Sequence, residues 1–338
     1  MRKILLFVVV SLLIRFGYAQ NEGWAICNSG ANLYFRIVGS GPPVLLVGDA
    51  GNSSHYLSEL VVQLSHTNRV VLYDPRAIGK SRFPVINDST INFAKAVADI
   101  EALRSVLRIP RWSVVGHGFG AKLAGVYAAQ YPQKIGQLVL INPTPITSVS
   151  SAIEDPFFDT FGEYSFSNML PENTQSQYFQ NFREQLQTFP TDSSARLKAI
   201  LDYQVATFVH DTLHQSLAAY FLEEKLRNRA IKNKISTNAT PKQWNYVHQL
   251  REQKVAVMVL LPNQRNNVDA LYEEWKAALP QATISKIDCA HHFPWLDNPS
   301  DFYSQVVPFL KRFNPELYAS EKKVSRIVGR GYQRRKRD

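Results

Sequence analysis

The stretch VVGHGFGA at residues 114–121 constrains the fold of this chain more than any other segment. A β-branched run leads into glycines at every second position, Gly116, Gly118 and Gly120, and an alanine-rich segment follows. Glycine tolerates the positive φ angles and close backbone approach that a sharp turn requires. The pattern therefore predicts a buried strand that turns abruptly into a helix, with Gly118 at the tip of the turn.

Short apolar runs and helical segments alternate on both sides of this turn. Apolar, β-branched runs of this kind are typical of parallel strands buried on both faces. We expect eight strands, at residues 24–27, 34–38, 43–47, 69–73, 112–115, 137–141, 256–261 and 282–287, the first two forming an antiparallel hairpin. Apolar spacings of three and four predict helices at 56–65, 93–106, 122–131, 269–279 and 299–313.

The alternation stops at Pro143. Residues 144–250 hold many aromatic side chains and no comparable strand, but helical patterns recur at 178–187, 195–209 and 213–227. We therefore expect a doubly wound, mostly parallel α/β sheet with an inserted helical cap. The expected parts are a core segment at 20–143, the cap at 144–250 and a second core segment at 251–318.

Several motifs stand in a fixed order along the chain. They are VGDAG at 47–51, YDPRAIGKS at 73–81, DIEALR at 99–104, the turn at Gly118 and HFPWLDNP at 292–299. In this order they resemble the α/β-hydrolase superfamily and, within it, the prolyl aminopeptidase branch. The resemblance covers residues 32–145 and 256–311 and implies an eight-stranded α/β-hydrolase sheet.

The resemblance implies a Ser-His-Asp site, in which a strained turn holds the nucleophile and an acid orients the histidine. The nucleophile position is Gly118, which has no side chain. The acid position, about four residues after the strand that ends at Leu261, is Arg265. A cation near a histidine disfavours the imidazolium that a general base must form. Both positions therefore depart from the catalytic pattern.

Of the implied triad, the base position alone is retained. It is His292 or, one residue earlier, His291. Asp269 and Asn142 remain open as displaced groups that orient this histidine, because an asparagine can fill that role in other triads. The alternative interpretation is that a histidine without these partners is only a polar group that lines a pocket.

The oxyanion loop shows a third departure. The resemblance places its amide donors at Phe119 and Asp49, with His117 beside the turn. An Asp49 carboxylate that points inward would oppose a developing negative charge. We expect Asp49, His117 and Phe119, together with His291 and His292, to line a ligand pocket.

The first residues indicate targeting rather than fold. Arg2 and Lys3 precede an apolar run at 4–14, and small residues, Gly17 and Ala19, follow at the expected cleavage positions. This pattern predicts a signal peptide at 1–19 and a secreted protein. The alternative is an uncleaved membrane anchor, although eleven apolar residues fall short of the roughly 20 that a spanning helix needs.

The formal net charge of +10 is concentrated at the two ends of the chain. Three positive charges lie in the signal segment and a net six lie in residues 321–338, so the body is close to neutral. A neutral body argues against a nucleic-acid-binding domain. We expect the basic tail at 319–338 to be disordered; it is also compatible with contacts to anionic lipid or glycosaminoglycan, or with processing at its Arg-Arg-Lys-Arg run.

Cysteines and glycosylation sequons suggest a secreted chain only weakly. Cys27 and Cys289 would lie at opposite edges of the expected sheet, which predicts separate thiols or an intermolecular bond. Asn-x-Ser/Thr sequons at Asn52, Asn87 and Asn238 predict glycosylation, and a glycan at Asn52 would crowd the mouth of the cleft. The spacing of these residues indicates no metal or cofactor site.

The residues leave three functions open. The first is a secreted pseudoenzyme that binds a small apolar or peptide-like ligand, or a protein partner. The second is a serine-independent hydrolase of esters or aminoacyl amides, in which His291 or His292 activates a water. A third interpretation makes the basic tail the functional part and the domain its carrier.

Overall fold

A computed structural model of the chain describes residues 21–27, 30–83, 85–144, 146, 188, 209, 212–237, 246–264 and 268–312. They form an eight-stranded sheet with the order β1-β2-β4-β3-β5-β6-β7-β8. The strands are β1 (Asn21–Ile26), β2 (Asn32–Val38), β3 (Pro43–Val47), β4 (Arg69–Tyr73), β5 (Trp112–His117), β6 (Ile135–Ile141), β7 (Val257–Pro262) and β8 (Thr283–Ile287). β2 is antiparallel to both neighbours and all other pairs are parallel. The predicted doubly wound, mostly parallel sheet is therefore confirmed.

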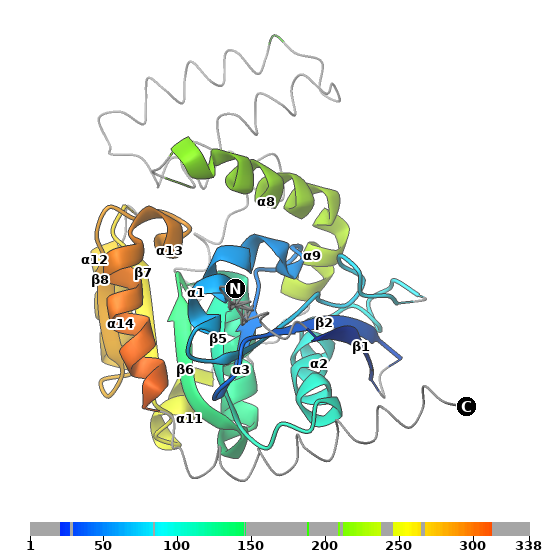
Figure 1. Ribbon diagram of the computed structural model, residues 1–338, viewed down its shortest axis with the longest axis horizontal. Coiled ribbons are helices and arrows are strands. Elements are labelled where there is room, and N and C mark those ends of the chain that lie inside the picture. The colour runs from blue at the N-terminus through cyan, green and yellow to red at the C-terminus, as the bar shows by residue number, and fades with distance from the viewer. Residues whose placement is uncertain are drawn as a thin grey trace, which may run out of the picture.

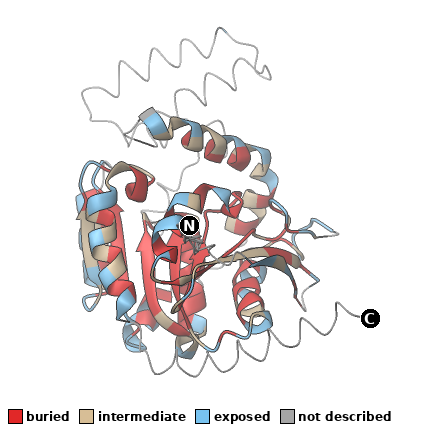
Figure 2. Ribbon diagram, in the orientation of Figure 1, coloured by how far each residue is buried: buried red, intermediate tan, exposed pale blue. Residues whose placement is uncertain are grey.

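Helices cover both faces of the sheet (Figure 1). One face packs against α1 (Ser58–Ser65) and α14 (Pro299–Lys311). The other packs against α2 (Phe93–Val106), α3 (Phe119–Gln130), α11 (Tyr246–Glu252) and α12 (Val268–Ala278). Successive strand residues point to opposite faces, so Val44 and Leu46 join the first cluster and Leu45 and Val47 the second. Figure 2 shows the central strands buried and the helices exposed on their outer sides.

The structure describes only part of the predicted cap. Between β6 and β7 it contains η3 (Thr212–His214), α8 (Gln215–Arg227), α9 (Arg229–Thr237) and α11. The helix expected at 213–227 is present as α8, whereas the helices expected at 178–187 and 195–209 fall outside the described residues except Val209. The prediction placed residues 246–250 in the cap, but α11 packs on α3 of the core, where Tyr246 lies against Gly125. A Cβ on Gly125 would lie 2.3 Å from the Tyr246 ring.

The two cysteines lie at opposite edges of the sheet, as expected. Cys27 follows the edge strand β1 and Cys289 follows the edge strand β8, and both thiols are free. Burial raises the pKa of the Cys27 thiol to about 11. Within the described part of the chain, no helix combines the length and apolar character needed to cross a membrane.

A buried ion pair fixes the loop after β4 against α2. The guanidinium of Arg76 donates to both carboxylate oxygens of Asp99, at 2.7 and 2.5 Å, and the two side chains are 1% and 2% exposed. Arg76 also donates to the carbonyl of Thr90. The guanidinium is almost fully removed from water, so its positive charge needs the Asp99 carboxylate as a counter-ion.

We expect Asp99→Ala to lower the free energy of unfolding by about 3–5 kcal/mol, because it leaves the buried Arg76 charge uncompensated. Denaturant-induced unfolding followed by circular dichroism measures this change. The matched control is Asp269→Ala, which removes a carboxylate that is 88% exposed and pairs with Lys286 at the surface, and should change stability little. Equal losses in the two variants would contradict the assignment.

Candidate functional site

The predicted strand-turn-helix at Gly118 is present. β5 ends at His117, Gly118 has φ 57° and ψ −125°, and α3 begins at Phe119. The amide of Gly118 donates to the carbonyl of Ile141 at 3.0 Å. A Cβ on Gly120 would lie 2.3 Å from the carbonyl oxygen of Gly48, so the turn packs directly on the loop after β3. This contact brings Asp49 to the tip of the turn.

The Asp49 carboxylate fills the space at the tip. Its Oδ1 accepts the amides of Phe119 at 2.9 Å and of Ala50 at 2.8 Å. A Cβ on Gly118 would lie 2.9 Å from the Asp49 carboxyl carbon, closer than real side-chain contacts come. The expected pair of open amides at Phe119 and Asp49 is therefore wrong: the first binds the Asp49 carboxylate, and the second donates to the Tyr56 hydroxyl at 2.7 Å.

A lysine from α8 balances the charge of this carboxylate. Lys225 Nζ lies 2.8 Å from Asp49 Oδ2, and the two side chains are 9% and 4% exposed. Burial raises the pKa of the Asp49 carboxyl, but the Lys225 ammonium and the Phe119 amide oppose this, and the net shift is downward. The carboxylate is thus a fixed anion at the position where the resemblance to the α/β-hydrolases placed the amide donors.

Further polar contacts fasten α8 to the loop after β3. Figure 1 shows α8 above α1, at the upper end of the described residues, and α8 contacts η1 (Ser54–Leu57). Glu224 Oε2 accepts from the amide and hydroxyl of Ser53, Asn52 donates to the Phe221 carbonyl, and Asn228 donates to the Gly51 carbonyl, all at 2.7–3.0 Å. With the Lys225 pair, these bonds hold α8 closed over residues 49–53.

The same contacts overturn one predicted glycosylation site. Asn52 is fully buried and its Nδ2, the atom that would carry a glycan, donates to the Phe221 carbonyl at 2.7 Å. A glycan there is incompatible with this packing, so the expectation of a glycan at the cleft mouth is wrong for the folded chain. Asn87 is exposed, and Asn238 lies outside the described residues.

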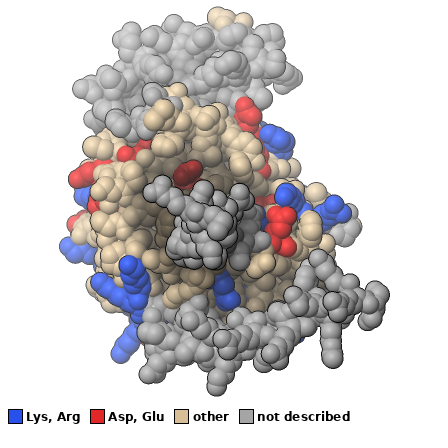
Figure 3. Space-filling view, in the orientation of Figure 1, with Lys and Arg blue, Asp and Glu red and all other residues tan. Residues whose placement is uncertain are grey.

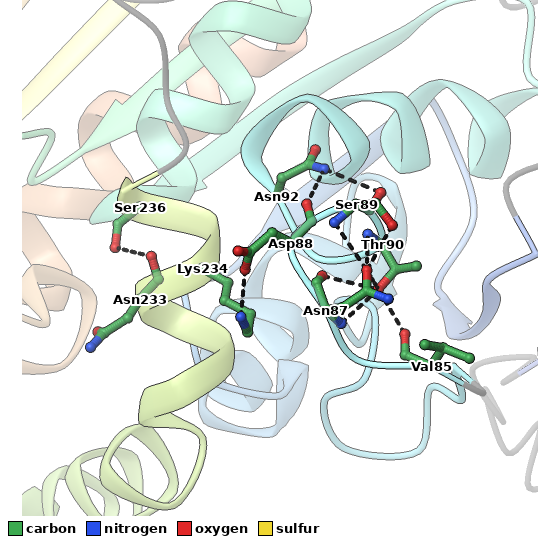
Figure 4. A network of polar contacts seen from close by, with 9 residues as sticks. All are labelled: Val85, Asn87, Asp88, Ser89, Thr90, Asn92, Asn233, Lys234 and Ser236. Carbon is green, nitrogen blue, oxygen red and sulfur yellow. Dashed lines mark hydrogen bonds and ion pairs between the residues drawn. The ribbon is translucent and has the colours of Figure 1, made fainter.

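Asn87 belongs to a polar loop before α2. Its Oδ1 accepts from the backbone and hydroxyl of Ser89 and from the amide of Thr90, at 2.7–3.1 Å (Figure 4). The neighbouring Asp88 pairs with Lys234 of α9 at 2.5 Å. These contacts hold the loop while the Asn87 side chain remains at the surface.

His117 is part of a buried hydrogen-bond chain. The Tyr56 hydroxyl, which accepts from the Asp49 amide, donates to His117 Nδ1 at 3.0 Å, and His117 Nε2 donates to the His292 carbonyl at 2.9 Å. Burial lowers the pKa of His117 to about 4, so the ring is neutral at pH 7. Because both ring nitrogens are engaged and His117 is 1% exposed, its predicted role in lining a ligand pocket is wrong.

His292, rather than His291, lies at the site. His292 Nδ1 accepts from Asn142 Nδ2 at 3.0 Å, which places the ring proton on Nε2, 3.9 Å from Asp49 Oδ2. A general base must present an unprotonated nitrogen to the reacting group, and here that nitrogen faces Asn142. His291 instead lies beside Asp297, whose carboxylate accepts its backbone amide at 2.8 Å.

Of the two alternative orienting groups, Asn142 reaches the histidine, whereas Asp269 pairs with Lys286 at the surface. Arg265 falls outside the described residues.

Sequence reasoning missed Lys225 and Tyr56, which complete the charge balance and the hydrogen-bond chain. Both looked like ordinary positions of predicted helical segments, and no motif marked them.

Aromatic rings surround these polar contacts. Tyr56, Phe221 and Phe293 are fully buried, with ring centroids 4.9 Å apart for Tyr56 and Phe221 and 5.1 Å apart for Phe221 and Phe293. Trp295 packs edge-on against His117 at 4.8 Å. The centre of the site is therefore filled by side chains of the protein itself.

The buried His117 predicts a pH dependence of stability. Between pH 6.5 and about 4 the unfolded chain protonates this histidine while the folded chain does not, so the unfolded state binds more protons. Stability should therefore fall as the pH is lowered through this window, by about 3 kcal/mol from this residue. Denaturant unfolding at a series of pH values, compared with His117→Gln, measures the contribution; identical slopes in the two proteins would contradict it.

Comparison with known proteins places these features in a family. Residues 42–299 match the family described as alpha/beta hydrolase fold. A proline iminopeptidase of Lactiplantibacillus plantarum is 34% identical over 119 residues, which are 33% of this chain and 41% of that protein. An uncharacterized protein of Mycobacterium tuberculosis is 34% identical over 113 residues, and the match spans about a third of that relative, 32% of its length.

Longer matches are more distant. The serine hydrolase-like protein of Danio rerio is 23% identical over 296 residues, covering 83% of this chain and 85% of that protein. The crystal structure of a proline iminopeptidase from Mycobacterium smegmatis superposes with a TM-score of 0.68 at 14% identity, covering 87% of this chain and 98% of the other. Sheet order, the turn at Gly118 and the match over residues 42–299 agree: the chain belongs to the alpha/beta hydrolase fold family.

Proposed function

We propose that the protein is a secreted, non-hydrolytic member of this family that acts by binding, with Gly118 in place of the nucleophilic serine. The observation that carries the proposal is the Asp49 carboxylate on the Phe119 amide. In acyl transfer, that amide stabilises the negative charge that develops on the substrate carbonyl. Here an anion of the protein already occupies it.

The chemistry lost at this site is large. Removal of the serine alone from a serine hydrolase costs about 10⁶-fold in turnover. A substrate carbonyl would also have to displace a carboxylate that is held by two amides and by Lys225. The second function, hydrolysis by water activated at His292, is disfavoured because the unprotonated nitrogen of the ring faces Asn142.

The packing of the site favours a protein partner over a small ligand. Aromatic side chains fill its centre, and α8 is fastened over the loop after β3. A small apolar or peptide-like ligand would require these contacts to open. Figure 3 shows acidic and basic residues interspersed over the described part of one face, which favours protein over nucleic acid. We also propose that the basic tail at 319–338 contacts anionic lipid or glycosaminoglycan.

Restoring a serine should not restore a reactive site by itself. In Gly118→Ser the new Cβ meets the Asp49 carboxyl at 2.9 Å, so we expect no labelling by a fluorophosphonate probe. Labelling should appear when Gly118→Ser is combined with Asp49→Gly, with Lys225→Met, which avoids an unpaired buried ammonium, and with Asn142→Asp, whose carboxylate would accept the proton of His292 Nδ1 and leave Nε2 unprotonated toward the serine. Gel fluorescence measures labelling, and circular dichroism verifies folding.

The control is the Asp49→Gly, Lys225→Met, Asn142→Asp variant with Gly118 retained, which should remain unlabelled. Turnover of aryl esters and prolyl amides by the unmodified protein should not exceed that of buffer. Turnover that is present in the unmodified protein and lost in His292→Ala would overturn the proposal and support the serine-independent hydrolase.

Secretion predicts a glycan at one of the two described sequons. Chain passed through a eukaryotic secretory pathway should carry an N-glycan at Asn87, where the amide is at the surface, and none at Asn52, where it is buried. Intact-mass spectrometry before and after glycosidase treatment measures this. Asn87→Gln should remove one glycan mass and Asn52→Gln none. A folded protein that carries a glycan at Asn52 would contradict the structure.

A further inference from the structure

Five consecutive residues of the loop before α2, 85–89, are exposed. Val85 and Ile86 are each 52% exposed, so two large aliphatic side chains lie next to one another in water. Adjacent exposed apolar side chains of this kind commonly mark a surface that another group covers. The next residue, Asn87, begins an Asn-Asp-Ser sequon, so a covering group can be attached directly beside this surface.

The turn that carries Asn87 is held in one shape. Thr90 Oγ1 donates to the Val85 carbonyl at 2.7 Å and accepts from the Asn87 backbone amide at 3.0 Å (Figure 4). The Thr90 carbonyl in turn accepts from the buried guanidinium of Arg76, which ties the turn to the core. A single hydroxyl group therefore holds Val85 and Asn87 close together.

Only the oxygen of the Asn87 side chain is engaged. Oδ1 accepts from the amides of Ser89 and Thr90 at 3.0 and 3.1 Å, whereas in the described part of the chain no hydrogen bond engages Nδ2. Transfer of a sugar from a lipid-linked diphosphate forms the bond between C1 and Nδ2, breaks the bond from C1 to the diphosphate and releases one amide proton. Because Oδ1 is unchanged by this step, the turn keeps both hydrogen bonds when the sugar is attached.

The surroundings direct the sugar toward Val85 and Ile86. On the side of α9, Asp88 pairs with Lys234 at 2.5 Å, and Figure 4 shows Val85 on the other side of Asn87. N-acetylglucosamine, the first sugar of such a glycan, presents ring C–H groups and an acetyl methyl to aliphatic side chains while its hydroxyl groups remain in water. The exposure of Val85 and Ile86 is that of the chain without sugar.

We propose that the innermost N-acetylglucosamine on Asn87 packs over Val85 and Ile86 and covers this part of the surface. The contact rests on the proposed secretion, because the secretory route supplies the glycan. No sequon lies within β1, so its exposed side chains, Trp24 and Ile26, have no comparable cover and serve as an internal reference.

Hydroxyl-radical footprinting of the full chain, secreted by a eukaryotic host that adds high-mannose glycans, measures the cover at each side chain. The glycosylated protein is compared with Ser89→Ala, which destroys the sequon but retains Asn87 and its two amide hydrogen bonds, and with Ser89→Thr, which retains the sequon. Oxidation of Val85 and Ile86 should be about threefold slower in the two glycosylated proteins than in Ser89→Ala. Oxidation of Ile26 should be unchanged, and endoglycosidase trimming to the first sugar should preserve the protection.

The outcomes distinguish this contact from the proposed secretion. Retention of the chain inside the host would overturn the secretion and the contact with it. A chain that is secreted without sugar at Asn87 overturns the contact alone. So does a glycosylated chain in which Val85 and Ile86 react as fast as in Ser89→Ala, or lose their protection on trimming.

A packing contact also contributes to stability, which a sugar that only shades the surface does not do through these side chains. The glycosylated protein should unfold at a higher temperature than Ser89→Ala. In the Val85→Ser, Ile86→Ser background this difference should shrink, because the sugar has lost the aliphatic surface on which it packs, whereas Ile26→Ser on β1 should leave it unchanged. Calorimetry of the six proteins measures the differences, and one that the double substitution leaves unchanged would overturn the contact.

Discussion

The buried carboxylate of Asp49 is the constraint on which the rest of the site depends. A charge removed from water must be paired and hydrogen-bonded, and Asp49 obtains this from three elements at once: its own loop through Ala50, the turn through Phe119, and α8 through Lys225. Each contact fixes an element relative to the others. The position next to it must then be glycine, because even a Cβ at residue 118 would meet the carboxyl carbon at 2.9 Å.

The same arrangement positions the two histidines of the site, His117 and His292. The Asp49 amide is used by Tyr56, Tyr56 orients His117, and His117 donates to the backbone of His292. Groups that a hydrolase would keep available for its substrate here bond to one another. A buried hydrogen-bond network of this kind adds rigidity and specifies one packing of the core, and this structural role accounts for the burial of His117.

The sequence predicted the fold well because its signals are local. β3 and β4 occupy the expected residues. Where strands and helices alternate along a chain, a short, continuous β-branched run between turns predicts a buried strand. It also located Gly118, Asp49 and His292, which stand in short motifs. Lys225 could not be predicted, because it meets Asp49 across 176 residues and its helix reads only as an amphipathic segment. The prediction of a glycan at Asn52 was wrong for the same reason. A sequon is a local sequence pattern, whereas the burial of Asn52 depends on where α8 packs.

Because side chains of the protein itself fill the centre of the site, a binding partner of the closed protein would contact its outer surface. Polar groups that are already paired gain little from a ligand, so association must be driven by apolar surface that is still exposed to water. Among the described residues, four of the seven large hydrophobic side chains that remain exposed are Trp24, Ile26, Val85 and Ile86, on β1 and the loop after Arg82. Trp24 and Ile26 lie on β1, at the edge of the sheet opposite β8.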